Sequence, residues 1–215
     1  MVDSSSFETL IESPVIPVIV LSEVQLAIPL AEVLLDSGLT VIEITLRTEV
    51  AMSAIRLISE AFPKAIVGAG TVTTHDQIVL ARDSGASFVI SPGISKKMCQ
   101  AANSSYLPFL PGIATPSEIL MAREAGFSIC KFFPSEGLGG VERLEMFAQI
   151  FPDMKFCPTG GISEANLESY LSLASVPVVA GSWIAPDALI LAKDWVEIEA
   201  RAQRALEIAG RTGKA

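Results

Sequence analysis

Lys131 has the clearest chemical potential in this sequence, because it interrupts the apolar run Phe127-Ser-Ile-Cys-Lys-Phe-Phe-Pro134. A lysine is seldom buried unless its charge is paired or the residue has a chemical role. Burial favours the neutral amine, a nucleophile that can attack a carbonyl carbon and form a Schiff base. The structural alternative is a lysine whose stem packs in the core while its amine reaches solvent at the rim.

Polar and aliphatic residues alternate in the segment Val41-Ile-Glu-Ile-Thr-Leu-Arg-Thr48. In a strand, Glu43, Thr45 and Arg47 project to one face, and the aliphatic side chains project to the other. Helices pack on an apolar face, so we expect the polar face to point into the interior that Lys131 also enters. A structural ion pair between Glu43 and Arg47 is the alternative. Together with an interior amine, however, the set is better suited to carbonyl chemistry.

Glycines and small hydroxylic residues follow the last two predicted strands, in Pro158-Thr-Gly-Gly161 and Ala180-Gly-Ser182. Backbone N–H groups can approach an anion closely where no side chain obstructs them. In eight-stranded barrels the loops after strands seven and eight are the usual phosphate-binding location. These loops therefore indicate a phosphorylated substrate.

Eight short runs rich in β-branched or aromatic residues must position these side chains, and they alternate with segments of helical periodicity. The runs are 15–20, 40–46, 65–70, 88–92, 108–113, 129–134, 155–160 and 176–181. This pattern predicts an α/β fold, a (β/α)8 TIM barrel formed by a single domain over residues 1–215, with a short extra N-terminal helix at 5–12. An open doubly wound sheet is the alternative, but no Gly-x-Gly-x-x-Gly turn opens the first helix.

Helix boundaries are marked by capping residues. Ser22 with Gln25 and Thr115 with Glu118 have capping-box spacing, and Ser163 is a further N-cap. Three glycines, at 38, 85 and 126, are placed to end helices just before the next strand. The periodicity of residues 195–210 predicts a final amphipathic helix.

Composition excludes several classes of function. A net charge of -9 without clusters of Lys or Arg argues against nucleic acid as a partner, and no apolar segment is long enough to span a membrane. Cys99, Cys130 and Cys157 lack metal-ligand spacing and are expected to be reduced core thiols. The single histidine, His75, makes a histidine-based metal site improbable, and no role is assigned to it. We expect no metal and no cofactor, and a cytoplasmic location because the N-terminus has no secretory pattern.

Seven segments in this order resemble the 2-keto-3-deoxy-6-phosphogluconate (KDPG) aldolase family, which includes the 4-hydroxy-2-oxoglutarate (KHG) aldolases. They are Pro14-Val-Ile-Pro-Val-Ile19, Glu43-Ile-Thr-Leu-Arg-Thr48, Ile66-Val-Gly-Ala-Gly-Thr-Val72, Ile90-Ser-Pro-Gly93, Lys131-Phe-Phe-Pro134, Phe156-Cys-Pro-Thr-Gly-Gly-Ile162 and Gly181-Ser-Trp183. The resemblance covers nearly the whole chain. It implies a Schiff-base aldolase, a carbon–carbon lyase that releases pyruvate from a phosphorylated keto acid, and a homotrimer.

The resemblance also implies a role for each matching residue. Lys131 is the imine-forming nucleophile and Glu43 the general acid/base, while Arg47 and Thr71 bind the pyruvate carboxylate. The substrate pocket is shaped by Pro92, Phe133 and Thr159, and phosphate is bound by Gly160, Gly161 and Ser182. Ser135 departs from the alanine expected in many relatives, and residues 136–140 are expected to form a loop that varies among them.

Two other functions remain open from the residues. Another phosphate-binding barrel enzyme, such as an epimerase, an isomerase or a thiamin phosphate synthase-like transferase, uses the same glycine loops but does not require Lys131 beside Glu43. A non-catalytic barrel that binds phosphorylated sugar acids gains nothing from a costly buried amine. The sequence does not choose between KDPG and KHG as the physiological substrate.

Overall fold

Strands and helices alternate along the chain in the computed structural model, which describes residues 13–105 and 107–213. All strand pairs are parallel, and the strands are almost wholly buried. The strands are β1 (Val15–Ile19), β2 (Val41–Thr45), β3 (Ile66–Gly70), β4 (Phe88–Ile90), β5 (Phe109–Leu110), β6 (Gly112–Ile113), β7 (Ile129–Phe132), β8 (Lys155–Pro158) and β9 (Val179–Gly181). The predicted α/β class is therefore confirmed.

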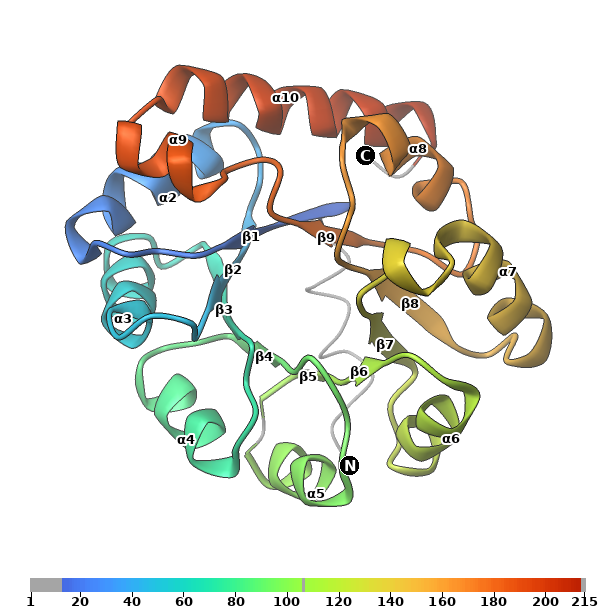
Figure 1. Cartoon of the computed structure of the whole chain (residues 1–215). Coiled ribbons are helices and arrows are strands. Elements are labelled where there is room, and N and C mark those ends of the chain that lie inside the picture. Colours follow the sequence, from blue (N-terminus) through green and yellow to red (C-terminus); the bar gives the residue numbers. More distant parts are fainter. Residues whose placement is uncertain (1–12, 106, 214–215) are drawn as a thin grey trace.

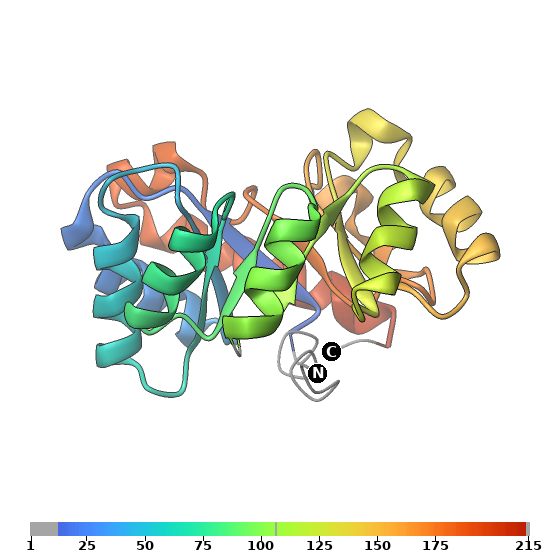
Figure 2. The ribbon, with the colours of Figure 1, turned by 90° about the horizontal axis from the view of Figure 1, so that it is seen from below.

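The strands form two parallel sheets. Six strands pair in the order β5-β4-β3-β2-β1-β9, and three pair in the order β6-β7-β8. Figure 1 shows the strands around a common centre with the helices outside them, and Figure 2 shows the same arrangement from the side. An isolated parallel bridge between Thr159 and Ala180 joins the end of β8 to β9. At the other junction, Pro111 separates β5 from β6.

The helices connect successive strands and cover their outer side (Figure 1). They are α2 (Ala27–Asp36), α3 (Ala51–Ala61), α4 (His75–Asp83), α5 (Lys96–Ser105), α6 (Pro116–Glu124), α7 (Gly140–Ile150), α8 (Glu164–Leu171), α9 (Asp187–Ala192) and α10 (Trp195–Arg211), with short 3-10 turns η1 (Val24–Leu26) and η2 (Glu136–Leu138). The predicted last helix is confirmed as α10, which buries Ile198, Ala202, Ala205 and Ala209. None of the helices within the described residues is long and apolar enough to cross a membrane.

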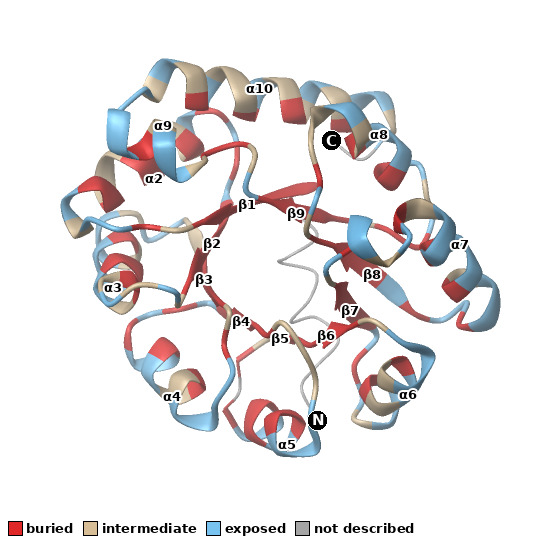
Figure 3. Ribbon diagram, viewed as in Figure 1, coloured by how far each residue is buried: buried red, intermediate tan, exposed pale blue. Residues whose placement is uncertain are grey.

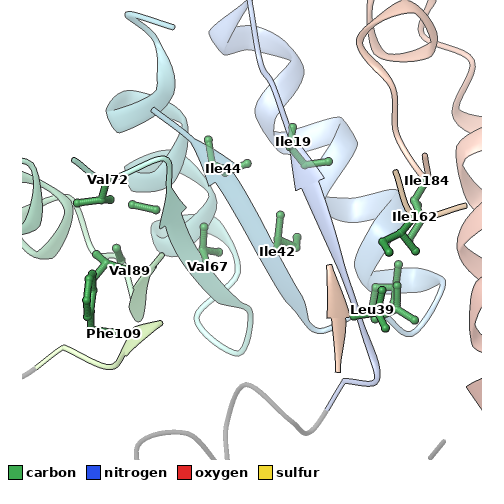
Figure 4. Close-up of a cluster of buried hydrophobic side chains, with 14 of the residues drawn as sticks. Ile19, Leu39, Ile42, Ile44, Val67, Val72, Val89, Phe109, Ile162 and Ile184 are labelled. Atoms are coloured by element: carbon green, nitrogen blue, oxygen red, sulfur yellow. The ribbon is translucent and has the colours of Figure 1, made fainter. Parts of the chain in front are cut away.

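Two groups of buried side chains lie on opposite faces of the strands. The larger cluster includes strand residues such as Ile42, Ile44 and Val67, shown in Figure 4. Apolar residues of the helices belong to the same cluster. The smaller cluster contains Val41 and Ile129 and consists almost entirely of strand residues, so it fills the space that the strands enclose. Figure 3 shows the buried strands inside a ring of helices that are exposed on their outer faces. The inner face of each strand is thus separated from solvent except at its ends.

Several predicted boundaries are confirmed. The capping box of Thr115 and Glu118 is formed, and Ser163 caps α8 in a box with Asn166. The three glycines have φ of +94° at Gly38, +87° at Gly85 and +91° at Gly126. A side chain at these positions would be strained, so glycine is what allows each helix to end there.

Other predicted boundaries were wrong. Ser22 and Gln25 form no capping box, because the Ser22 hydroxyl donates to Asp187 and the Gln25 amide donates to Glu23. The predicted strand 108–113 is split into β5 and β6, since Pro111 has no N–H for the ladder. The last strand begins at Val179 rather than at residue 176. Pro177, which also lacks an N–H, lies within the predicted range. The predicted helix at 5–12 lies outside the described residues.

Candidate active site

Lys131 lies on β7 and projects into the space enclosed by the strands. Its side chain is 7% exposed, so the amine does not reach solvent at the rim. The Nζ atom lies 3.5 Å from Oε1 of Glu43 and 5.3 Å from the centre of the Phe133 ring. The interpretation of Lys131 as a structural lysine with a solvated head is therefore wrong. The amine instead faces a carboxylate and an aromatic ring.

Glu43 lies on β2 with its carboxylate fully buried. Oε1 contacts Lys131, whereas Oε2 is buried with no hydrogen-bond partner among the described residues. A buried carboxylate oxygen without a partner carries a large desolvation cost, which a substrate or water proton can offset. The ion partner of Glu43 is Lys131 and not Arg47, so the structural pair considered as an alternative is absent from the described residues.

Gly70 makes room for this carboxylate. A Cβ atom at position 70 would lie 2.0 Å from Oε1 of Glu43 and 2.7 Å from its carboxyl carbon. Because no side chain fits there, the glycine allows Glu43 to lie across β3. The sequence analysis did not identify Gly70, and the signal that could have found it is the Gly68-Ala-Gly70 pattern opposite Glu43 in the strand register.

Thr45 and Arg47 continue the polar face of β2 toward the open end of the site. Thr45 is buried, and its hydroxyl donates to the carbonyl oxygen of Ile19 at 2.8 Å, which ties β2 to β1. Arg47 is exposed and makes no ion pair with any described residue. Its guanidinium is thus available to an anionic ligand.

Thr71 follows β3 with a φ of +59°, in the left-handed region. This conformation is costly for a β-branched residue and is found where the surrounding structure enforces it. Thr71 lines the same cavity as Lys131. The left-handed backbone conformation therefore helps to place Thr71 in the lining of the cavity that Lys131 enters.

The loops after β8 and β9 form a glycine cradle, which consists of Gly160, Gly161 and Ser182. Gly160 has a φ of +94° and Gly161 a φ of +80°, so both adopt left-handed backbone conformations. The amide of Asn166 donates to the carbonyl oxygen of Gly161 at 3.0 Å and fixes the loop to the start of α8. At Gly160 and Gly161 the cradle has no side chain to obstruct the cavity, and Ser182 adds a hydroxyl group to its lining.

All but one of the sequence-predicted site residues line one cavity of about 330 Å³. Its volume suits a small metabolite. The lining residues are Val18, Val20, Glu43, Thr45, Arg47, Thr71, Lys131, Phe133, Thr159, Gly160, Gly161, Ile162, Gly181 and Ser182. Pro92 is the exception, and its backbone carbonyl group packs against Gly112 of β6. Sequence analysis missed Val18, Val20, Ile162 and Gly181.

Cys157 lies beside Lys131, its partner in the register of β7 and β8. The thiol is fully buried, and burial raises the pKa of Cys157 to about 12. All three cysteines are free and buried, so the prediction of reduced core thiols is confirmed. Among the described residues no group of three His, Cys, Asp or Glu side chains could hold a metal ion.

Comparisons with known proteins give one consistent result. A family model for KDPG and KHG aldolases matches residues 7–201. A KHG/KDPG aldolase of Escherichia coli is 43% identical over 204 residues, which cover 95% of this chain and 96% of that protein.

Solved structures show the same likeness. A KDPG aldolase from Legionella pneumophila, with pyruvate captured as a covalent carbinolamine intermediate, has a TM-score of 0.91 and 42% identity and covers 93% of this chain and 97% of its own. A KDPG aldolase of Zymomonas mobilis with 3-phosphoglycerate has a TM-score of 0.88 and 36% identity, over 93% of this chain and 94% of its own. The likeness extends over nearly the whole chain in sequence and in fold.

Proposed function

The chain belongs to the family of KDPG and KHG aldolases, and on this basis we propose that it cleaves KDPG to pyruvate and glyceraldehyde 3-phosphate through a lysine Schiff base. The observation that supports this most directly is the buried Lys131 amine 3.5 Å from the Glu43 carboxylate in a small cavity. The dual naming of the Escherichia coli relative supports a second reaction, the cleavage of KHG to pyruvate and glyoxylate. The family consists of lyases, which disfavours the isomerase and the non-catalytic alternatives.

Lys131 and Glu43 divide the chemistry between them. The amine attacks C2 of the keto acid and gives a carbinolamine, which loses water to form a protonated imine. Glu43 accepts the proton of the C4 hydroxyl as the C3–C4 bond breaks, and the bonding electrons pass to the imine nitrogen and leave an enamine. The aldehyde departs, the protonated Glu43 returns its proton to C3 of the enamine, and addition of water to the resulting imine releases pyruvate and the free Lys131 amine.

The remaining residues hold the two ends of the substrate. Arg47 and Thr71 bind the carboxylate next to C2, one by charge and the other by its hydroxyl. The glycine cradle binds the phosphate through backbone N–H groups and the Ser182 hydroxyl, close to the N-terminus of α8. Phe133 and Thr159 shape the cavity between these ends.

Borohydride reduction in the presence of pyruvate tests the Schiff base. We expect a stable adduct on the peptide that contains Lys131, detected by mass spectrometry. Lys131→Arg should abolish both the adduct and cleavage activity, because the guanidinium is not a nucleophile. Lys97→Arg, at an exposed lysine of α5, is the matched control and should leave both unchanged. An adduct at another lysine, or full activity of Lys131→Arg, would reject the mechanism.

We further propose that the two sheets form one closed (β/α)8 barrel and that residues 1–215 are a single domain. The bridge between Thr159 and Ala180 supports closure on one side. On the other side, only Pro111 separates β5 from β6 along the chain, which supports closure there as well. The shared apolar cluster, which includes residues from β1 to α10, supports a single folding unit.

The family resemblance is also the basis for proposing a homotrimer that acts in the cytoplasm on small-molecule substrates. Sedimentation velocity of the purified chain tests the assembly, and a species of one or two chains would reject it. Comparison of kcat/KM for KDPG and KHG identifies the preferred substrate.

A further inference from the structure

A carboxylate lies against the glycine cradle, where its negative charge would oppose an anionic ligand. The backbone N–H of Glu136 donates to the carbonyl oxygen of Gly160 at 3.1 Å. A Cβ atom at Gly161 would lie 2.5 Å from Cγ and 2.6 Å from Cβ of Glu136, so the stem of this side chain packs on the cradle. Glu136 is nevertheless absent from the lining of the cavity. Its charge is thus near the cradle but turned away from it.

Tyr170 of α8 is the side chain that directs the Glu136 carboxylate. The Tyr170 hydroxyl donates a hydrogen bond to Oε1 of Glu136 and accepts one of 3.0 Å from the hydroxyl of Ser135. Tyr170 and Ser135 are both fully buried. Because Ser135 supplies a proton to the phenol oxygen, the phenol proton is left to point toward Glu136. Burial and the hydrogen bond to Glu136 raise the pKa of Tyr170 to about 12, so the hydroxyl remains a donor.

The first residue of α7 also lies close to the Glu136 carboxylate. A Cβ atom at Gly140, the first residue of α7, would lie 3.0 Å from the Tyr170 hydroxyl and 3.1 Å from Oε1 of Glu136. Gly140 has a φ of +56°, so both its backbone conformation and the space around it require glycine. The N-terminus of a helix also favours a negative charge.

We propose that Tyr170 is a positioning residue that holds the Glu136 carboxylate at the start of α7 and so keeps the glycine cradle open to the phosphate of the substrate. This inference rests on the proposed role of Gly160, Gly161 and Ser182 in phosphate binding. It gives Ser135, where alanine is expected in many relatives, a function in orienting the Tyr170 hydroxyl. The selectivity of the site for phosphorylated substrates then depends on a side chain that does not touch them.

Substitution of Tyr170 by phenylalanine tests this role. Tyr170→Phe removes the donor, and the released carboxylate should raise the KM for KDPG about three- to tenfold through repulsion of the phosphate, with kcat unchanged. Exchange of the C3 protons of pyruvate with deuterium needs Lys131 and Glu43 but no phosphate, so its rate should stay at the wild-type value. Adding Glu136→Gln to Tyr170→Phe removes the charge and should restore the KM. A purely structural role of the hydroxyl would not be rescued in this way.

A second pair of variants leaves Tyr170 in place, should the first variant fail to fold. Glu136→Asp keeps the charge on a stem too short to reach Tyr170, and it should raise the KM for KDPG. Glu136→Gln keeps the length and can accept the same hydrogen bond, and it should leave the KM unchanged.

The outcomes separate this inference from the proposed function. If the wild-type protein exchanges pyruvate protons and cleaves KDPG, but Glu136→Asp and Tyr170→Phe leave the KM unchanged, the positioning role is wrong and the aldolase remains. A KM that rises in Tyr170→Phe and is not restored by Glu136→Gln rejects it as well. If the wild-type protein neither exchanges pyruvate protons nor cleaves KDPG, the proposed function and the inference both fail.

Discussion

Glu43 and Gly70 depend on each other, since the carboxylate occupies the space that a side chain at position 70 would fill. The position of Glu43, the proposed proton acceptor, therefore depends on both β2 and β3. The partnerless Oε2 atom is the part of Glu43 left for a proton of the substrate or of a water molecule. A change at position 70 should therefore affect proton transfer without removing any reacting group.

Gly70→Ala should lower kcat by about a hundredfold, the typical contribution of one general acid/base, because Glu43 must move away from Lys131. Borohydride trapping of pyruvate on Lys131 should still occur, since the amine is untouched. Glu43→Asp in the same background shortens the acid and should recover part of the rate. Gly93→Ala is the matched control, because a Cβ at Gly93 would contact nothing within 4 Å. Unchanged kcat in Gly70→Ala would contradict the role of this contact.

The sequence was enough to predict many of the residues that line the cavity, because successive side chains of a strand point to opposite faces. Alternation along a strand is a local property, so it was enough to place Lys131, Glu43 and Arg47 around one cavity. Pro92 and the left-handed backbone of Thr71 were different, because they depend on how a loop packs on a neighbouring strand. Such packing has no signature in local periodicity.

Among the helices, α10 connects the two loops of the glycine cradle through a network of charged side chains. Arg204 pairs with Glu164, at the start of α8, and with Glu197, while Arg201 pairs with Glu197 at 2.7 Å. Arg201 also donates to the carbonyl oxygen of Trp183, next to Ser182, at 2.9 Å. The network thus joins the segment after β8 to the segment after β9.

Glu197 gives the network a dependence on pH. The hydrogen bond from Arg201 lowers the pKa of Glu197 below its ordinary value of 4.5. A carboxyl group with a lower pKa in the folded state stabilises the fold above pH 4.5, and this contribution is lost as the pH falls through the folded value. Urea denaturation at about pH 6 and about pH 4 should therefore show a smaller loss of stability in Glu197→Gln than in the wild type.

The control for this experiment is Glu199→Gln, on the same helix. Glu199 accepts a hydrogen bond from Gln203 but makes no ion pair with a described residue. Its replacement should leave the wild-type loss of stability unchanged. Equal losses in Glu197→Gln and the wild type would show that the pair with Arg201 does not persist in solution.

Helix boundaries were predictable where the capping contact is local and failed where it is tertiary. Thr115 and Ser163 bond to residues three positions ahead, so spacing alone identifies them. Ser22 has a suitable partner in sequence, but its hydroxyl donates to Asp187 at the start of α9. Ser22 and Asp187 are 165 residues apart, so this contact cannot be predicted from a short segment of sequence.

For the whole molecule, the burial of the cysteines offers a direct test of a single domain. Cys99 lies on α5, Cys130 on β7 and Cys157 on β8, and all three are buried. Burial raises the pKa of each thiol, so a thiol reagent should react with none of them in the native protein. In rising urea, all three should become reactive together with the change in tryptophan fluorescence. Exposure of one thiol before the others would indicate separate folding units.

The count of eight strand-like runs predicted the α/β class, because strands buried on both faces have a strong compositional signal. The composition of the strands does not show whether they close into one ring. The contact between Thr159 and Ala180, which would close the proposed barrel on one side, is a single bridge, and the break at Pro111 divides a run that the sequence analysis treats as one strand. Closure is a property of the assembled sheets rather than of any segment.

This division into two sheets has a consequence for the position of the two proposed catalytic residues. Lys131 belongs to the sheet of β6, β7 and β8, whereas Glu43 belongs to the sheet that contains β2. Their separation of 3.5 Å is therefore not fixed by a shared hydrogen-bonded ladder, but by the placement of one sheet relative to the other. The backbone contacts that cross the junctions, from the N–H of Gly112 to the carbonyl oxygen of Gly93 and between Thr159 and Ala180, therefore help to hold the amine beside the carboxylate.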